Sequence, residues 1–383
     1  MSSSLFNQVP EASTDPIFQL AVAFAEDPRP HKVNLSVGLY RDEKLQTPIL
    51  KAVKTAEKYL LAHETTKEYL PISGDPLYIE KSGRLILGDK LWDQHHSRIC
   101  GIQTPGGTGA LRIAAEFMRQ FVSDHIAIPD PTWPNHLGIF NRCGYQIHAY
   151  PYYDLATHHS AIQAILDTLK KIPARSIVLF HACCHNPTGA DLTEKEWDDV
   201  FHVVQKRKLL PLFDLAYQGL AKGIEQDPYV IRKLLERSMD GVVAFSYSKN
   251  FGLYSERVGG LFAITPSAAI AEHVLSQLKI FARTNYSNPP KHGAAIVTHI
   301  LSTPELKKEW IQEVDKMRDR LNHLRKEFVA SLQKGPSPID FSHLLDQVGM
   351  FCFLGLSKDK VERLREEYGI YMTSDGRMNL AGL

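Results

Sequence analysis

Apolar residues in the middle of the chain come in short continuous runs, each followed by polar side chains. The runs are IAIP from Ile126, SIVLF from Ser176, LLPLF from Leu209 and VVAF from Val242. Uninterrupted runs of this length predict strands that are buried on both faces. Helical segments separate the last three runs. This order predicts right-handed crossovers in a mainly parallel sheet, with its ligand at the carboxyl ends of the strands.

Helical spacing dominates the carboxyl-terminal part of the chain. Apolar residues recur at alternating steps of four and three between Pro304 and Gly335, which predicts one long helix that bridges two domains. Beyond it, residues 339–383 alternate short strands with a helix at Lys358 to Tyr368, as a small α+β unit would. At the amino end we expect an extended arm with a short helix near Ile17 to Ala25.

Two loops near the amino end present candidate ligand-binding residues. VNLSVGLYRDE, from Val33 to Glu43, predicts a strand and a turn around Gly38. That glycine permits close approach of a ligand, although by itself it also fits a plain tight turn. KEYLPISGDP is a loop rich in Gly and Pro that presents Tyr69.

The totals describe an ordinary globular protein. The sequence has 383 residues, 44% apolar and 23% charged, enough for a large core and two or more domains. Lys and Arg number 44 against 43 Asp and Glu, so we expect no broad basic surface for nucleic acid or an anionic membrane. Five cysteines without a CxxC pair predict free thiols in a reducing compartment. With neither a secretion signal nor a long apolar stretch, the expected location is the cytoplasm.

Lys249 is the centre of the most informative segment, SYSKNFGLYSERVGG, which follows the last apolar run. Ser246 and Ser248 stand where the predicted strand opens into a loop, and Arg257 follows. Hydroxyls and a guanidinium suit the oxygens of a phosphate. An amine near a phosphate and an arginine becomes a better nucleophile toward an aldehyde, as a pyridoxal phosphate Schiff base requires. Alone, the pattern also fits a surface lysine and arginine beside a core strand.

A second candidate anion site lies in the segment TPGGTGALR. Its three glycines, Gly106, Gly107 and Gly109, precede an amphipathic helix whose first N–H groups would point at a bound anion. Glycine loops before helices are common, so this signal is weak alone. Further on, a loop bounded by prolines exposes Trp133 beside His136; the indole can stack on a flat heteroaromatic ring or serve in packing.

Polar side chains also follow two other predicted strands. Asn186 comes after the run SIVLF and can donate to a phenolic oxygen. Asp214 ends the run LLPLFD, with Tyr217 three residues on. A buried carboxylate there needs a partner: a protonated pyridine nitrogen, an arginine or a helix that it caps. A zinc site is the alternative for the nearby thiols and imidazoles, although no second pair of ligands follows. That group is His181, Cys183, Cys184 and His185.

These segments belong to a set of seven motifs: GGTGALR, TWPNH, HACCHNPTG, FDLAYQG, SYSKNFGLYSERVGG, RTNYSNPP and GRMNLAGL. In order and approximate spacing they resemble the aspartate aminotransferase family, fold-type I pyridoxal phosphate enzymes, over nearly the whole chain. The resemblance implies an α/β fold whose large cofactor-binding domain, residues 51–305, has a mainly parallel seven-stranded sheet flanked by helices. It implies a smaller α+β domain from both chain ends, residues 1–50 and 306–383.

The resemblance also implies a role for each residue of the cofactor site. Lys249 would hold the aldehyde of pyridoxal phosphate as an aldimine and move a proton between substrate and cofactor. Asp214, with His136 behind it, would keep the pyridine nitrogen protonated. Tyr217 and Asn186 would form hydrogen bonds with the phenolic oxygen of the cofactor ring. The other implied contacts are Trp133 on the ring and, at the phosphate, Gly107, Thr108, Ser246, Ser248, Arg257 and, from a second subunit, Tyr69.

Two arginines set the implied substrate. Arg377 would pair with the α-carboxylate, and Arg283, in a loop of the neighbouring subunit, with the distal carboxylate of aspartate or glutamate. Gly38, Trp133 and Asn186 would lie beside the substrate. Family members that act on aromatic amino acids keep both arginines, so the two arginines do not decide between aspartate, tyrosine and phenylalanine as the amino donor. The implied reaction is a ping-pong transfer of the amino group to 2-oxoglutarate.

The implied enzyme is a homodimer whose active sites are shared across the interface. It would bind amino acids and 2-oxo acids as substrates, and we expect it to bind neither nucleic acid nor a membrane. A pyridoxal phosphate lyase or decarboxylase on the same fold is the alternative. Such an enzyme would share Lys249, Asp214 and Arg257 but would not need Arg283.

Overall fold

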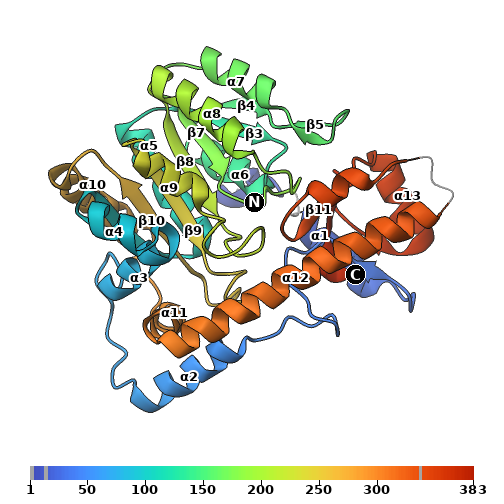
Figure 1. The fold of residues 1–383 in the computed structure, drawn as a ribbon, viewed down its shortest axis with the longest axis horizontal. Coiled ribbons are helices and arrows are strands. Elements are labelled where there is room, and N and C mark those ends of the chain that lie inside the picture. The colour runs from blue at the N-terminus through green and yellow to red at the C-terminus, as the bar shows by residue number, and fades with distance from the viewer. Residues whose placement is uncertain (1–3, 13–15, 336–338) are drawn as a thin grey trace.

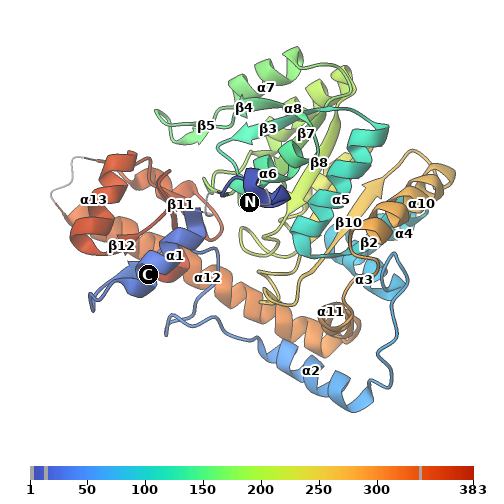
Figure 2. The same cartoon turned by 180° about the vertical axis from the view of Figure 1, so that it is seen from behind.

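A computed structural model describes residues 4–12, 16–335 and 339–383 and shows a large body built on one sheet and a smaller body beside it (Figure 1). The long helix α12 (Pro304–Lys334) runs from the large body to the smaller one in both views (Figures 1 and 2). At its start it packs against α11 (His292–Ser302) and α2 (Lys51–His63). The predicted bridging helix is therefore confirmed.

The large body is organised by a seven-stranded sheet, as predicted. Strand β10 is antiparallel to both of its neighbours, and the remaining pairs are parallel. In spatial order the strands are β2 (Ile99–Pro105), β10 (Val258–Ile264), β9 (Gly241–Ser246), β8 (Leu210–Leu215), β7 (Ile177–His181), β3 (His125–Asp130) and β4 (Gln146–Pro151).

Alternate residues of the central strands enter two separate hydrophobic cores. In β7, Ile177 and Leu179 belong to one core, and Val178 and Phe180 to the other. Because side chains alternate across a strand, both faces of the sheet are covered, and the strands are apolar throughout. One face carries α5 (Gly106–Phe121), α6 (Pro134–Arg142) and α10 (Ala268–Asn285). The other carries α3 (Pro76–Leu87), α4 (Asp89–His95), α7 (Ile162–Lys171), α8 (Glu194–Arg207) and α9 (Tyr229–Glu236).

Both ends of the chain build the smaller body. One pair of strands from it is antiparallel, and the other joins the amino-terminal segment to the carboxyl-terminal one in parallel. The strands are β11 (Phe351–Phe353) with β13 (Arg377–Asn379), and β1 (Val33–Asn34) with β12 (Ile370–Tyr371). Its helices are α1 (Pro16–Glu26) and α13 (Lys358–Tyr368).

Short elements complete the described chain. A hairpin of β5 (Tyr153–Asp154) and β6 (His159–Ser160) projects from the large body toward the smaller one (Figure 1). The 3-10 segments are η1 (Leu5–Gln8), η2 (His96–Arg98), η3 (Ser342–Asp346) and η4 (Leu380–Gly382).

Local features complete the comparison with the sequence. Thr193 and Glu196 form a reciprocal capping box at the start of α8. The five cysteines all lie in the described part and are free thiols. Of the strand and the turn around Gly38 predicted between Val33 and Glu43, only Val33–Asn34 is a strand. The chain around Gly38 is an irregular loop, and the turn comes later, at residues 43–44. Within the described residues no helix is long and apolar enough to span a membrane.

Candidate active site

A cavity of about 240 Å³ lies at the carboxyl ends of the parallel strands, where the smaller body closes over the sheet. Most of the residues singled out in the sequence line it. They are Gly38, Gly107, Thr108, Trp133, Asn186, Asp214, Tyr217, Ser246, Ser248, Lys249, Arg257 and Arg377. Sheet topology is the reason, since parallel strands bring their carboxyl ends to one edge.

Lys249 lies three residues beyond β9, in a turn that packs against α12. The indole of Trp310 on α12 stacks on Phe251 with centroids 4.2 Å apart, and it donates to the carbonyl of Asn250 at 2.8 Å. The amine lies 5.0 Å from the centroid of Tyr217. Burial, reinforced by nearby guanidinium groups and opposed by Asp214, lowers the pKa of Lys249 to about 8. The amine is thus more often neutral, and more nucleophilic, than an ordinary lysine at the same pH.

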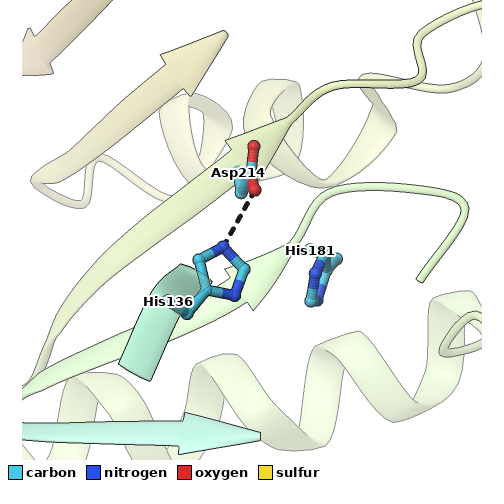
Figure 3. A group of neighbouring side chains, drawn as sticks. All are labelled: His136, His181 and Asp214. Carbon is cyan, nitrogen blue, oxygen red and sulfur yellow. Dashed lines mark hydrogen bonds and ion pairs between the residues drawn. The ribbon is translucent and has the colours of Figure 1, made fainter. Parts of the chain in front are cut away.

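Asp214, in β8, is buried and faces the same cavity. Its Oδ2 lies 3.0 Å from Nε2 of His136, which is fully buried on α6, and Figure 3 shows this contact. Burial alone would raise the pKa of Asp214, but the hydrogen bond and charge of His136, helped by His181 and Lys249, hold that pKa below its ordinary value. The carboxylate therefore stays ionised and can pair with a protonated ring nitrogen.

Hydrogen-bond donors gather at one end of the cavity, from β9, the turn before β10 and the start of α5. Ser248 accepts a hydrogen bond from Ser246 at 3.1 Å and from Arg257 at 3.3 Å. Gly106 has φ +75°, and a Cβ there would lie 2.3 Å from Nη2 of Arg257, so only glycine lets the guanidinium approach. The free N–H groups of the first turn of α5 add donors suited to a phosphate.

At the opposite side, Arg377 enters from β13 of the smaller body and is buried. It donates to the side-chain oxygen of Asn186 at 3.2 Å and to the carbonyl of Ser36 at 2.8 Å. The ring of Phe351 covers its guanidinium at 4.5 Å. Burial lowers the pKa of Arg377 without removing its charge at neutral pH, so the cavity presents a fixed cation for a carboxylate.

Comparisons with known proteins agree with this geometry. The family model described as aminotransferase class I and II matches residues 30–383. The chain is 44% identical to the aspartate aminotransferase of Escherichia coli over 380 residues, 99% of this chain and 96% of that protein. It is also 44% identical to the aromatic-amino-acid aminotransferase of Escherichia coli over 381 residues, 99% of this chain and 96% of that protein. The chain belongs to the class I and II aminotransferase family.

The same relationship holds among solved structures. A crystal structure of an aromatic-amino-acid aminotransferase from Burkholderia pseudomallei, covalently bound to pyridoxal phosphate, superimposes with a TM-score of 0.96 at 44% identity. That match covers 100% of this chain and 96% of the other. An aromatic aminotransferase from Psychrobacter, cocrystallised with aspartic acid, gives 0.96 at 38% identity, over 99% and 96% of the two chains.

The residues of this aminotransferase fit pyridoxal phosphate on the structure's own terms. One cavity holds three groups that match parts of this cofactor. Hydrogen-bond donors suit its phosphate, an ionised carboxylate suits its ring nitrogen, and an amine with a lowered pKa suits its aldehyde. Trp133 supplies a flat wall, and Tyr217 with Asn186, whose side chains lie 3.4 Å apart, supplies donors for a phenolic oxygen.

Two predicted site residues of the aminotransferase do not line this cavity. Tyr69 is 90% exposed. Arg283 was expected in a loop, but it lies in the last turn of α10. Its side chain is exposed there and donates a hydrogen bond to the hydroxyl of Ser287. Their predicted roles require a second subunit, so they stay predictions.

Sequence reasoning missed other residues that line the cavity. His181, at the end of β7, is buried, and neither ring nitrogen has a hydrogen-bond partner among the described residues. Burial lowers the pKa of His181 to about 3, so it contacts the cavity as a neutral ring. Ile17, Tyr254 and Phe351 also line it. Of these residues, only His181 and Tyr254 could have been proposed from the sequence, because they follow apolar strands within motifs already noted.

Among the described residues, the two thiols of the zinc alternative are grouped with only one further possible ligand, a carboxylate. Cys183 and Cys184 lie near Asp227, but both oxygens of that carboxylate already accept hydrogen bonds from backbone N–H groups of the loop 219–223. Burial raises the pKa of Cys184 to about 11, which keeps the thiol protonated. Metal binding needs the thiolate. His185 points elsewhere, stacking on Tyr152 at 3.6 Å.

Proposed function

We propose that this protein is a pyridoxal phosphate dependent aminotransferase that moves the amino group of aspartate, and of aromatic amino acids, to 2-oxoglutarate. The observation that carries the proposal is that Lys249, Asp214 and Arg257 line one cavity at the strand ends. Family membership and the names of the relatives, aspartate and aromatic-amino-acid aminotransferases, support it. They do not favour the alternative of a lyase or decarboxylase.

Each residue of the cavity has a distinct task in this reaction. The bound cofactor supplies an aldehyde that takes up the amino group and a ring that accepts electrons from the α carbon. Lys249 carries the proton away from the α carbon of the amino acid and is suited to do so because its pKa lies near neutrality. Asp214, kept ionised by His136, holds a proton on the ring nitrogen.

The remaining residues orient the reactants. Arg377, packed under Phe351, binds the α-carboxylate and so fixes the α carbon above the amine. Asn186 joins this arginine to Tyr217, so the substrate and cofactor positions are coupled. Gly107, Thr108, Ser246, Ser248 and Arg257 anchor the phosphate.

We further propose that the active enzyme is a homodimer in the cytoplasm with domains of residues 51–305 and of 1–50 with 306–383. A second subunit would supply Tyr69 to the phosphate and Arg283 to the distal carboxylate of the substrate. The exposure of both side chains in the single chain supports this proposal, because each is available for a contact with another copy. Aromatic substrates would be bound without the Arg283 ion pair.

The test is the visible absorption spectrum of the purified holoenzyme before and after L-aspartate, and in a fresh sample after L-phenylalanine, with no oxo acid present. Conversion of the bound cofactor to its amino form by both amino acids is the expected result. Conversion by one alone would name the specificity. A bound cofactor whose spectrum neither amino acid changes would overturn the proposed function.

A further inference from the structure

Two acidic side chains of the large body accept hydrogen bonds from the loops that carry Tyr217 and Asn186. Asp227 is buried in the loop between β8 and α9, and Asp191 is half-buried between β7 and α8. Both line a second cavity, of about 420 Å³. Neither aspartate is among the described residues that line the catalytic cavity, so each can act on a bound cofactor through the loop that it holds.

Asp227 gathers the backbone of the loop that follows Tyr217. The four donors are the N–H groups of Gly219 and Ala221 to Oδ2, at 2.7 and 3.0 Å, and of Lys222 and Gly223 to Oδ1, at 2.7 and 3.1 Å. Residues 217–223 form neither helix nor strand, so the carboxylate is the partner that satisfies these N–H groups. Burial raises the pKa of Asp227 despite the four bonds, which shows that a carboxylate is kept here at a cost.

Asp191 holds the two residues that precede Asn186. Its Oδ2 accepts a hydrogen bond from the N–H of Cys184 and its Oδ1 from the N–H of His185, both at 2.8 Å. Cys184 has φ +51°, in the left-handed region that residues other than glycine rarely adopt. The two bonds therefore hold a strained turn immediately before a residue that lines the catalytic cavity.

The two loops meet at the hydrogen-bond donors for the proposed cofactor. Nδ2 of Asn186 lies 3.4 Å from the hydroxyl oxygen of Tyr217, and Sγ of Cys184 lies 3.9 Å from the carbonyl oxygen of Tyr217. The side-chain oxygen of Asn186 also accepts a hydrogen bond from Arg377 at 3.2 Å. Hydrogen bonds weaken steeply with distance and angle, so a small displacement of either loop would weaken a contact with the phenolic oxygen of the cofactor.

We propose that Asp191 and Asp227 are positioning residues for the cofactor, each holding one loop so that Asn186 and Tyr217 can donate together to its phenolic oxygen. The inference rests on the proposed function, because it needs pyridoxal phosphate in the catalytic cavity. A carboxylate suits this task better than an amide of the same shape, since both of its oxygens accept hydrogen bonds. In Asp227→Asn an NH₂ group would face two backbone N–H donors, and in Asp191→Asn it would face one.

The experiment compares Asp191→Asn and Asp227→Asn with the wild type. In the holoenzyme the visible absorption is recorded against pH. In the apoenzyme the Kd for pyridoxal phosphate and the hydrogen exchange of backbone amides are measured. Asp199→Asn, at an exposed position on α8, is the matched control for loss of a carboxylate. Tyr145→Phe removes a buried hydrogen bond to the carbonyl of Ala115, at 2.8 Å, and so controls for lower stability alone.

Hydrogen bonds stabilise the ionised phenolic oxygen and so lower the pH at which the bound cofactor loses its proton. Both aspartate variants should therefore move the spectral transition to higher pH by at least about 0.5 unit and weaken cofactor binding by about threefold or more. Hydrogen exchange should quicken at residues 219–223 in Asp227→Asn and at residues 184–185 in Asp191→Asn.

The controls separate positioning from general loosening of the fold. Tyr145→Phe should lower Tm and leave the spectral transition in place, and Asp199→Asn should change neither. Asp191→Asn disturbs one bond instead of two, so it carries the test if Asp227→Asn does not fold. An unmoved transition in Asp191→Asn, or an equal shift in Tyr145→Phe, would overturn the inference, whereas a wild type that binds no pyridoxal phosphate would overturn the proposed function itself.

Discussion

The two sides of the catalytic cavity differ in how complete they are within one chain. On the cofactor side, Lys249, Asp214 and Arg257 lie close together, and their partners come from the same chain. On the side proposed for the substrate, Arg377 is buried and hydrogen-bonded, whereas Arg283, the second arginine of the proposal, is exposed on α10. One chain therefore supplies the amine, the carboxylate and the arginine of the cofactor side, and we propose that discrimination between distal groups of the substrate needs a second chain.

The largest expected effect comes from Lys249→Ala. Loss of the amine removes both the attachment of the cofactor and the proton carrier, so kcat with aspartate should fall by at least about 10⁴-fold. Steady-state assays with 2-oxoglutarate measure this. Lys195→Ala, at an exposed position on α8, is the matched control and should keep full activity. A Lys249→Ala enzyme as fast as the wild type would show that the amine is misassigned.

Asp214→Asn should come next. The amide keeps the shape of the side chain but cannot hold a positive charge on the ring nitrogen, and breaking a buried charge pair costs about 3–5 kcal/mol. We expect kcat to drop by about 10² to 10³-fold, with cofactor affinity also reduced. Asp319→Asn, which is 70% exposed on α12, controls for loss of a carboxylate. A loss below tenfold would show that the pair is not formed in the reaction.

Arg283→Leu tests the substrate side. Only aspartate has a distal carboxylate, so its kcat/KM should fall by about 10²-fold more than that of phenylalanine. Kinetics with both amino donors give the ratio directly. Equal losses for both substrates would mean that Arg283 has a structural role.

The pH dependence of cofactor binding is a milder test of the cofactor side. The pKa of Lys249 is lowered to about 8, and only the neutral amine attacks an aldehyde. The rate at which apoenzyme takes up pyridoxal phosphate should therefore rise about tenfold per pH unit below 8 and level off above it. Stopped-flow absorbance follows the reaction. A rate that keeps rising to pH 10 would show an ordinary lysine.

Much of this fold and site could be predicted from the sequence, for identifiable reasons. Continuous apolar runs marked the buried strands, and strand order placed Asn186, Asp214 and Lys249 at one edge. Irregular backbone was harder to predict. The alternation after Asn34 resembles a strand, but the backbone there forms hydrogen bonds with Tyr254 of the large body and Asn379 of the smaller one. Pairings between distant segments, such as Phe351 over Arg377 and His158 on His343, leave no periodic signal in a single sequence.

The most direct test of a shared active site uses hybrid dimers. Arg283→Leu and Lys249→Ala chains, each with a different affinity tag, are coexpressed, and dimers that carry both tags are isolated. If Arg283 acts across the interface, one of the two sites regains both groups, and the hybrid should show about half the wild-type activity with aspartate. If Arg283 acts within its own chain, neither site is complete. A hybrid no more active than the two parent variants would contradict the account.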